Sequence, residues 1–406
     1  MKKLSLVSLI FFFSFSIQAA EKKPKPPHFL VLSYPPRVDF SVEIPLVSPE
    51  MAGDMMRVKA KDLGFADFIL QPTPALFQNP AGLEPGKGFS AILPGNANPG
   101  KMKLAGVSKE DSPLHFEEME GGRLALLDGV RPVFVYNYGL QLASGAPEDR
   151  RRSTYIHPVY DLRGTVISED FPLDHFHHRG LSWMWPRVFV AGHEYDLWTI
   201  KGIWQHFDKW ICRQTGPVCA ILGVENSWQL QDRKVMQEYV WIRAFRQMGP
   251  GRVLDVRITL QALEPLELVG EKDKGYGGFS LRLPARQGTA VVTPEGLEQE
   301  DSNMKKVSWA DLSALFAGKS ERTGIAIFQH PSHPGHPAGW TLRVKDQYGF
   351  LGVAWPGWER VKLEPGKPVT VIYRVWIHDG GILEGKVKEQ FAGFSDPPKI
   401  RLLPSQ

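Results

Sequence analysis

The chain has 406 residues and a formal net charge of +4, from 48 basic and 44 acidic side chains. Two of the lysines lie within the first three residues, and EDRRRS at 148–153 is the one basic run, so this charge balance argues against a nucleic-acid-binding protein. About 385 residues remain after an N-terminal signal is removed, which is enough for one large domain or two ordinary ones.

Residues 1–20, MKKLSLVSLIFFFSFSIQAA, have the pattern of a secretory signal peptide. Lys2 and Lys3 precede an apolar run, and the small residues Ala19 and Ala20 end it. The run is too short for a membrane anchor, and no later stretch is apolar for long enough to span a bilayer. We therefore expect a soluble protein that is exported to the periplasm or secreted.

The remaining chain divides by composition into four parts. Residues 21–40 form a Lys/Pro-rich leader, and residues 41–130 form an N-terminal β-rich segment of short runs broken by Pro and Gly. We expect a large domain over 131–395 and a short tail over 396–406.

Three stretches alternate between apolar and polar residues and predict half-buried antiparallel strands, at 238–246, 253–263 and 369–380. Helical periodicity is scarce: 308–318, with Ser308 as N-cap, and 380–394 are the two predicted helices. With 39 Gly and 33 Pro dividing the chain into short pieces, the predicted class is mainly β, as a large sandwich.

Cys212 and Cys219 are the two cysteines of the chain. They flank a Thr-Gly-Pro turn between two short predicted strands, and export would place them in an oxidising compartment. We expect a disulfide between them, with two buried free thiols as the alternative.

The densest group of functional side chains is DHFHHRG at 174–180. In an extended segment, His175, His177 and Arg179 would share one face, while Asp174, Phe176 and His178 would share the other. As an acid/base site, His175 or His177 would be the base, with His178 beside them. Asp174 would orient the base, and Arg179 would bind an anion or a hydroxyl group.

Two other interpretations of this motif remain open. His175 and His177 could bind a divalent metal with a third ligand from His157, His330 or Glu225, although Arg179 would repel the cation. Alternatively, the motif could be a buried hydrogen-bond network that holds two loops together. His157, next to a proline, fits a structural role better than a catalytic one.

Further candidates for contact with a substrate lie elsewhere. Trp183 and Trp185 could stack on a sugar ring, although a packed aromatic core explains any single tryptophan as well. His330 in QHPSHPGHP, Glu225 in GVENSWQ and Arg282 in GGFSLRL are candidate polar contacts.

Several blocks of this sequence resemble a bacterial family that carries the label "methane oxygenase PmoA" or "domain of unknown function". The blocks are HPVY at 157–160, DFP at 170–172, DH at 174–175, HHRG at 177–180, Trp183, and the segments 324–340 and 373–381. The resemblance covers about 115–395; Phe176 stands where the family more often has proline. It implies a fold related to the β-supersandwich of galactose mutarotases and many polysaccharide lyases, and hence a carbohydrate ligand.

Together these observations predict an antiparallel, galactose-mutarotase-like β-supersandwich preceded by a smaller β-rich segment. The predicted function is an exported carbohydrate-active enzyme that acts on a glycoside or sugar acid by hydrolysis, elimination or epimerisation. A non-catalytic glycan-binding protein and a metal-dependent oxidase are the alternatives. The expected partner is a small molecule or oligosaccharide, and the one cofactor considered is a divalent metal.

Overall fold

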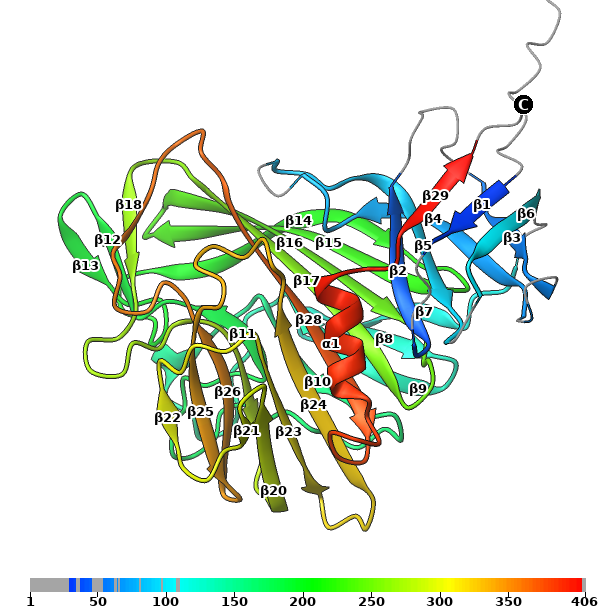
Figure 1. Cartoon of the computed structure of the whole chain (residues 1–406). Helices are drawn as coiled ribbons and strands as arrows, with labels where there is room; N and C mark the ends of the chain where they lie inside the picture. The colour runs from blue at the N-terminus through cyan, green and yellow to red at the C-terminus, as the bar shows by residue number, and fades with distance from the viewer. Residues whose placement is uncertain are drawn as a thin grey trace, which may run out of the picture.

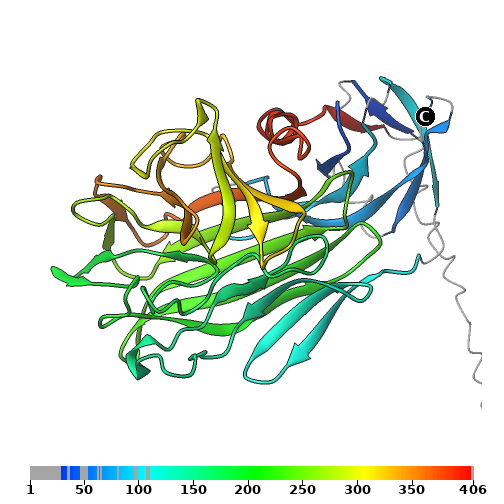
Figure 2. The same ribbon diagram turned by 90° about the horizontal axis from the view of Figure 1, so that it is seen from below.

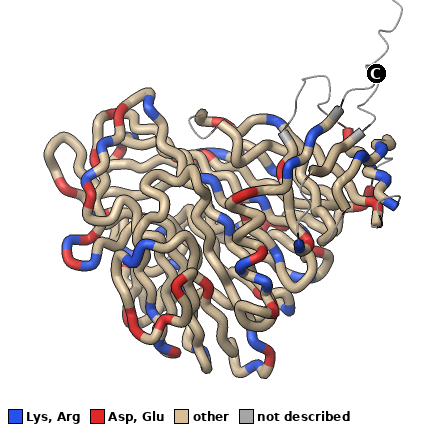
Figure 3. Tube along the Cα trace, in the orientation of Figure 1, with Lys and Arg blue, Asp and Glu red and all other residues tan. Residues whose placement is uncertain are grey.

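The computed structural model describes residues 29–33, 37–45, 54–61, 64, 66–79, 82–95, 98–106 and 110–403. The expected signal peptide at 1–20 and most of the leader lie outside these residues. In the described part, no helix is both long and apolar enough to cross a membrane. Figure 3 shows acidic and basic residues interspersed along the trace.

Two nine-stranded antiparallel sheets form the body of the molecule (Figure 1). Sheet I has the order β22 (Ser302–Asn303), β25 (Gly339–Lys345), β26 (Tyr348–Ala354), β19 (Gly278–Leu283), β11 (Leu181–Met184), β10 (Tyr155–Val159), β9 (Arg131–Asn137), β8 (Arg123–Asp128) and β7 (Leu114–Met119). Sheet II has the order β14 (Trp204–Gln214), β15 (Cys219–Leu230), β16 (Arg233–Phe245), β17 (Gly251–Ala262), β28 (Val369–Asp379), β24 (Arg322–Gln329), β23 (Trp309–Phe316), β20 (Arg286–Thr293) and β21 (Gly296–Leu297). The expected mainly β, antiparallel supersandwich is confirmed.

Two smaller sheets complete the fold. An N-terminal sheet has the order β2 (Phe40–Pro45), β5 (Gly86–Leu93), β4 (Phe68–Ala75), β3 (Met56–Lys59), β6 (Gly100–Gly106), β1 (Phe29–Leu32) and β29 (Ile400–Leu403). A four-stranded sheet has the order β13 (His193–Tyr195), β12 (Arg187–Val190), β18 (Leu266–Val269) and β27 (Val361–Leu363). Figure 2 shows the N-terminal sheet at one end of the molecule.

The borders of the sheets differ from the expected segment borders at 130 and 396. β7 and β8 precede residue 130 but pair with each other and with β9, so they belong to sheet I. β29 lies in the expected tail and pairs with β1, so the two ends of the described chain meet in the N-terminal sheet.

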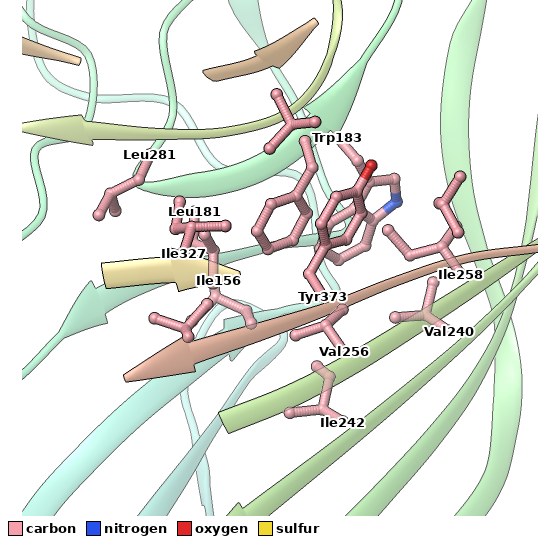
Figure 4. Packing of buried hydrophobic residues seen from close by; sticks show 14 of the residues in the cluster. Ile156, Leu181, Trp183, Val240, Ile242, Val256, Ile258, Leu281, Ile327 and Tyr373 are labelled. Carbon is pink, nitrogen blue, oxygen red and sulfur yellow. The ribbon is translucent and has the colours of Figure 1, made fainter. Parts of the chain in front are cut away.

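The main core lies between sheets I and II. Trp183 of sheet I packs there with Val240 and Ile258 of sheet II, and Tyr373 lies in the same layer (Figure 4). Because side chains alternate along a strand, Ser182 and Met184 point to the opposite face of sheet I. The candidate site lies on that opposite face.

The three predicted strands correspond to β16, β17 and β28. The predicted helix at 308–318 is wrong, because this segment forms β23 in the interior of sheet II. Ala310, Leu312 and Ala314 join the main core, while Trp309 packs on the other face with the N-terminal sheet. A strand buried on both faces reads as a continuous apolar run, which sequence periodicity does not distinguish from a buried helix. The helix predicted at 380–394 forms in its second half, as α1 (Val387–Ser395).

The expected disulfide is also wrong: both thiols are free. Cys212 lies in β14 and pairs with Gly223, four residues beyond Cys219 in β15. That offset corresponds to roughly 13 Å along a strand. A disulfide needs Cα atoms within about 7 Å of each other, so this register separates the two cysteines.

Candidate active site

The histidine motif forms consecutive turns instead of an extended segment. The His175 amide donates to the Pro172 carbonyl at 2.9 Å, and the His178 amide donates to the His175 carbonyl at 2.8 Å. The expected alternation of faces is therefore wrong. The His175 ring stacks on the His178 ring, with centroids 4.7 Å apart and planes at 16°, and the His177 ring meets His178 edge-on at 4.7 Å.

These three imidazoles line a pocket of about 460 Å³ on the outer face of sheet I. That volume lies within the range of small-molecule sites, roughly 300–1,000 Å³. Sheet I contributes Thr341, Arg343, Tyr348 and Phe350, and loops contribute Trp198, Lys274, Tyr276 and Asp301.

A chain of charged contacts holds His175 at the mouth of this pocket. His175 Nδ1 lies 3.0 Å from Asp174 Oδ2, and both oxygens of Asp174 lie 3.1 Å from Arg282 Nη2. Arg282 Nε in turn donates to Glu169 at 2.8 Å. Burial raises the pKa of Asp174, but His175 and Arg282 outweigh it and leave that pKa below its usual range. The carboxylate stays ionised within ion-pair distance of the imidazole, but His175 Nδ1 makes no hydrogen bond within the described residues, so the orienting role of Asp174 stays a prediction.

The other two imidazoles are held neutral. Burial, together with the charges of His175 and of Arg150, Arg152 and Arg179, lowers the pKa of His177 to about 3. Burial also lowers the pKa of His178 well below its usual range, again with positive neighbours adding to the effect. About 41% of the His175 side chain is accessible, whereas His178 is buried. The geometry therefore favours His175 over His177 as the proton-transfer group.

Arg179 does not reach the pocket. Its guanidinium is buried and donates to the carbonyls of Phe176, His178 and Arg150. The group lies 3.5 Å above the ring of Phe171, and Nε lies 3.6 Å from Asp170. The expected role of Arg179 as an anion or hydroxyl anchor is not supported, because its hydrogen bonds go to backbone carbonyls of the turn and of Arg150.

Ligand geometry for a metal is not present either. Within the residues that the structure describes, no group of three or more His, Cys, Asp or Glu side chains is placed to hold a metal ion. The rings of His175 and His177 lie 5.6 Å apart and are nearly perpendicular. The candidate third ligands do not line this pocket; they are His157, Glu225 and His330.

Each of these three residues has partners of its own. His157 Nδ1 lies 2.9 Å from Ser168 Oγ in a bracing contact, and burial lowers its pKa to about 4. Glu225 pairs with Lys209 on the edge of sheet II. His330 stacks on Phe77 of the segment after β4, with centroids 5.4 Å apart.

Trp183 and Trp185 are core residues and not pocket residues. Trp183 Nε1 donates to Glu238 at 3.0 Å, and Trp185 Nε1 donates to the Trp355 carbonyl at 2.8 Å. Among the tryptophans that follow the motif, Trp198 lines the pocket. Glu238 is fully buried and accepts three further hydrogen bonds, from Trp228, Asn226 and Gln205.

Sequence reasoning missed most of the pocket wall. Lys274, Tyr276, Asp301, Thr341, Arg343 and Tyr348 come from four separate segments, and no local pattern joins them. One signal was available in GYGGF at 275–279, where Gly275 precedes Tyr276 and two glycines follow it. Gly277 and Gly278 have φ angles of 139° and 111°, which favour glycine, and this turn presents Tyr276 to the pocket.

Comparison with solved structures finds distant similarity. The GH36 α-galactosidase AgaB from Geobacillus stearothermophilus is 9% identical with a TM-score of 0.35, and covers 69% of this chain and 42% of that one. The α-galactosidase from Lactobacillus brevis is 10% identical with a TM-score of 0.38, covering 72% and 41%. A galactose mutarotase related enzyme from Lactobacillus acidophilus is 8% identical with a TM-score of 0.31, covering 70% and 99%. The chain thus spans about two fifths of the length of the two galactosidases.

No curated protein matches the sequence. Residues 123–392 match the model described as "Family of unknown function (DUF6807)". The expected resemblance to a family of unknown function is confirmed, and the methane oxygenase label forms no part of that description.

Proposed function

Because the chain belongs to the Family of unknown function (DUF6807), we propose its activity from the pocket itself: an exported carbohydrate-active enzyme in which His175 transfers the proton. The reaction would be hydrolysis, elimination or epimerisation of a glycoside or sugar acid. Export to the periplasm or the medium rests on the signal-like pattern of residues 1–20.

The observation that carries this proposal is the Glu169–Arg282–Asp174–His175 series of contacts at an open pocket. Histidine is the side chain that gains and loses a proton most readily near neutral pH. A carboxylate 3.0 Å from Nδ1 stabilises the imidazolium that forms when the ring accepts a proton. Arg282 fixes that carboxylate and keeps it ionised.

Two half-buried tyrosines complete a surface for a sugar. Tyr276 and Tyr348 both line the pocket, and the Arg282 guanidinium packs 4.0 Å from the Tyr348 ring. Aromatic rings of this kind pack against the apolar face of a pyranose, while their hydroxyl groups bind its oxygens. Burial raises the pKa of Tyr348, so its hydroxyl remains a proton donor at neutral pH.

A screen against a glycan panel with mass-resolved products tests the proposal. We expect wild type to convert at least one glycan and His175→Ala to lower turnover by about 10²- to 10⁴-fold, as for loss of a general acid/base. His115→Ala, which removes a half-exposed histidine of β7, is the matched control and should retain full turnover.

The outcomes separate the reaction classes and the alternatives. A product heavier by water indicates hydrolysis, an unsaturated product indicates elimination, and a gain of oxygen that is lost with chelator indicates a metal-dependent oxidase. Epimerisation leaves the mass unchanged and is detected as uptake of deuterium from D2O. Binding of a glycan by calorimetry without any product would favour a glycan-binding protein. Turnover that is unchanged in His175→Ala would overturn the assigned role of His175.

A further inference from the structure

The hydrogen-bonding capacity of the pocket is unbalanced, because its carboxylates are occupied while several of its donors are free. Asp174 contacts Arg282 and His175 with its oxygens. Asp301 accepts from the Val344 amide at 2.9 Å and lies 3.8 Å from Arg343 Nε. Neither carboxylate is left to bind the hydroxyl or ammonium groups of a ligand on its own.

Unpartnered donors, in contrast, belong to residues that line the pocket. Trp198 is 2% exposed, and its buried Nε1–H has no hydrogen-bond partner among the described residues. The buried hydroxyl of Thr341, also in the wall, is likewise unpartnered in the described part of the chain. An indole N–H can only donate, so a bound ligand must bring an acceptor to it.

Several charged side chains near the pocket also favour a ligand that brings acceptor oxygens. Lys274 lies at the rim, and its ammonium makes no ion pair within the described residues. Behind the histidines, Arg150 and Arg152 donate to the carbonyls of 197–199, the segment that carries Trp198. Burial is the main reason that His177 and His178 stay neutral, and the charges that add to this effect are positive. A negative charge in this pocket would be stabilised.

We propose that the pocket takes a sugar that carries a carboxylate, a uronic acid or an oligosaccharide that contains one, whose acceptor oxygens are bound by Lys274 and by Trp198 Nε1. The inference rests on the proposed function of the same pocket and names its substrate class. A carboxylate supplies the two acceptor oxygens and the negative charge that the wall does not provide. Neutral hexoses and amino sugars do not supply that charge.

Calorimetric titration of the full chain with matched sugars tests this inference. Glucuronate and galacturonate are compared with glucose and galactose at neutral pH. We expect the uronates to bind at least about tenfold more tightly, as one hydrogen bond to a charged group provides. Added salt should weaken the binding of the uronates more than that of the hexoses.

Two variants locate the effect in the pocket. Lys274→Ala should lower uronate affinity by about tenfold and leave hexose affinity within about twofold. Trp198→Phe keeps an aromatic ring but removes the N–H, and should weaken the binding of the uronates more than that of the hexoses. Lys319→Ala, an exposed lysine in the turn between β23 and β24, is the control and should change neither.

Equal or tighter binding of the hexoses would overturn the choice of a uronic acid, and so would an equal loss for both classes in Lys274→Ala. The proposed function would survive either result, because it depends on turnover and on His175. Absence of binding by all four sugars would count against both the inference and the sugar pocket.

Discussion

Three adjacent histidines have different roles because their surroundings differ. His175 contacts an ionised carboxylate at the rim, whereas His177 and His178 lie deeper, near Arg150, Arg152 and Arg179. An imidazole is thereby a candidate for proton transfer at position 175 and a neutral part of the pocket wall at positions 177 and 178. Residue type by itself does not distinguish these cases.

This difference predicts a pH dependence of stability. The folded-state pKa of His177 is about 3, but the unfolded chain takes up the proton near the ordinary value of about 6.5. The unfolded state therefore binds more protons between these values, so the contribution of His177 to stability is complete above pH 6.5 and is lost as the pH falls towards 3. Urea denaturation of His177→Gln should show a smaller loss of stability between pH 7 and pH 5 than wild type.

The exposed His115 provides the matched control for this measurement. His115→Gln should reproduce the wild-type difference between the two pH values. The other buried histidines are present in all three proteins, so the comparison isolates His177. An identical loss in His177→Gln and wild type would contradict the assignment of a neutral imidazole.

At the scale of elements, the turn over 172–180 depends on one buried arginine. Arg179 donates to two carbonyls of this turn and to the carbonyl of Arg150, and packs on Phe171. An extended strand would satisfy its own backbone through a ladder, but consecutive turns leave carbonyls that need other donors. The turn that carries His175 is therefore stabilised by Arg179, a buried side chain that does not line the pocket.

Arg179→Ala should destabilise the protein by about 2–4 kcal/mol, because it leaves buried carbonyls without donors. Arg179→Lys should recover only part of this loss, since an ammonium does not match the planar fork of guanidinium. Chemical denaturation measures both variants. A stable Arg179→Ala protein that loses only sugar affinity would restore the rejected role of Arg179 as a ligand anchor.

Strand register makes a separate prediction about the thiols. Because Cys212 faces Gly223 across β14 and β15, no disulfide joins it to Cys219. Thiol titration without reductant should count two free groups after unfolding and at most one, the half-buried Cys212, before it. A count of zero after unfolding would show that the thiols are oxidised and that the register is wrong.

At the scale of the whole molecule, buried charges join the N-terminal sheet to sheet II. Arg243 of β16 contacts Glu43 of β2 at 2.8 Å and Asp255 of β17 at 2.9 Å. Arg374 of β28 binds the same Asp255 at 2.7 Å. Arg257 adds hydrogen bonds to four carbonyls of the loop between β4 and β5. The N-terminal sheet is therefore an integral cover of sheet II.

Glu43→Gln should destabilise the protein by about 2 kcal/mol, because one amide oxygen replaces a carboxylate that accepts from Arg243 and from the backbone amides of Leu76 and Phe77. Glu117→Gln, which alters an exposed carboxylate of β7, is the control and should change stability by less than about 0.5 kcal/mol. Urea denaturation checks both. A loss in Glu43→Gln that equals the control would mean that this contact does not couple the sheets.

The sequence by itself determined the fold class, the strands at 238–246, 253–263 and 369–380, and the motif that carries the catalytic candidate. Those features are local, since alternation along a strand and the density of imidazoles need no knowledge of neighbours in space. The tertiary structure alone decided which of the three pocket histidines lies next to an ionised carboxylate, that Trp183 and Arg179 lie outside the pocket, and that 308–318 is a strand. Each of these depends on burial and on partners from distant segments, such as Arg282 for Asp174, and chain order does not encode which distant side chains meet.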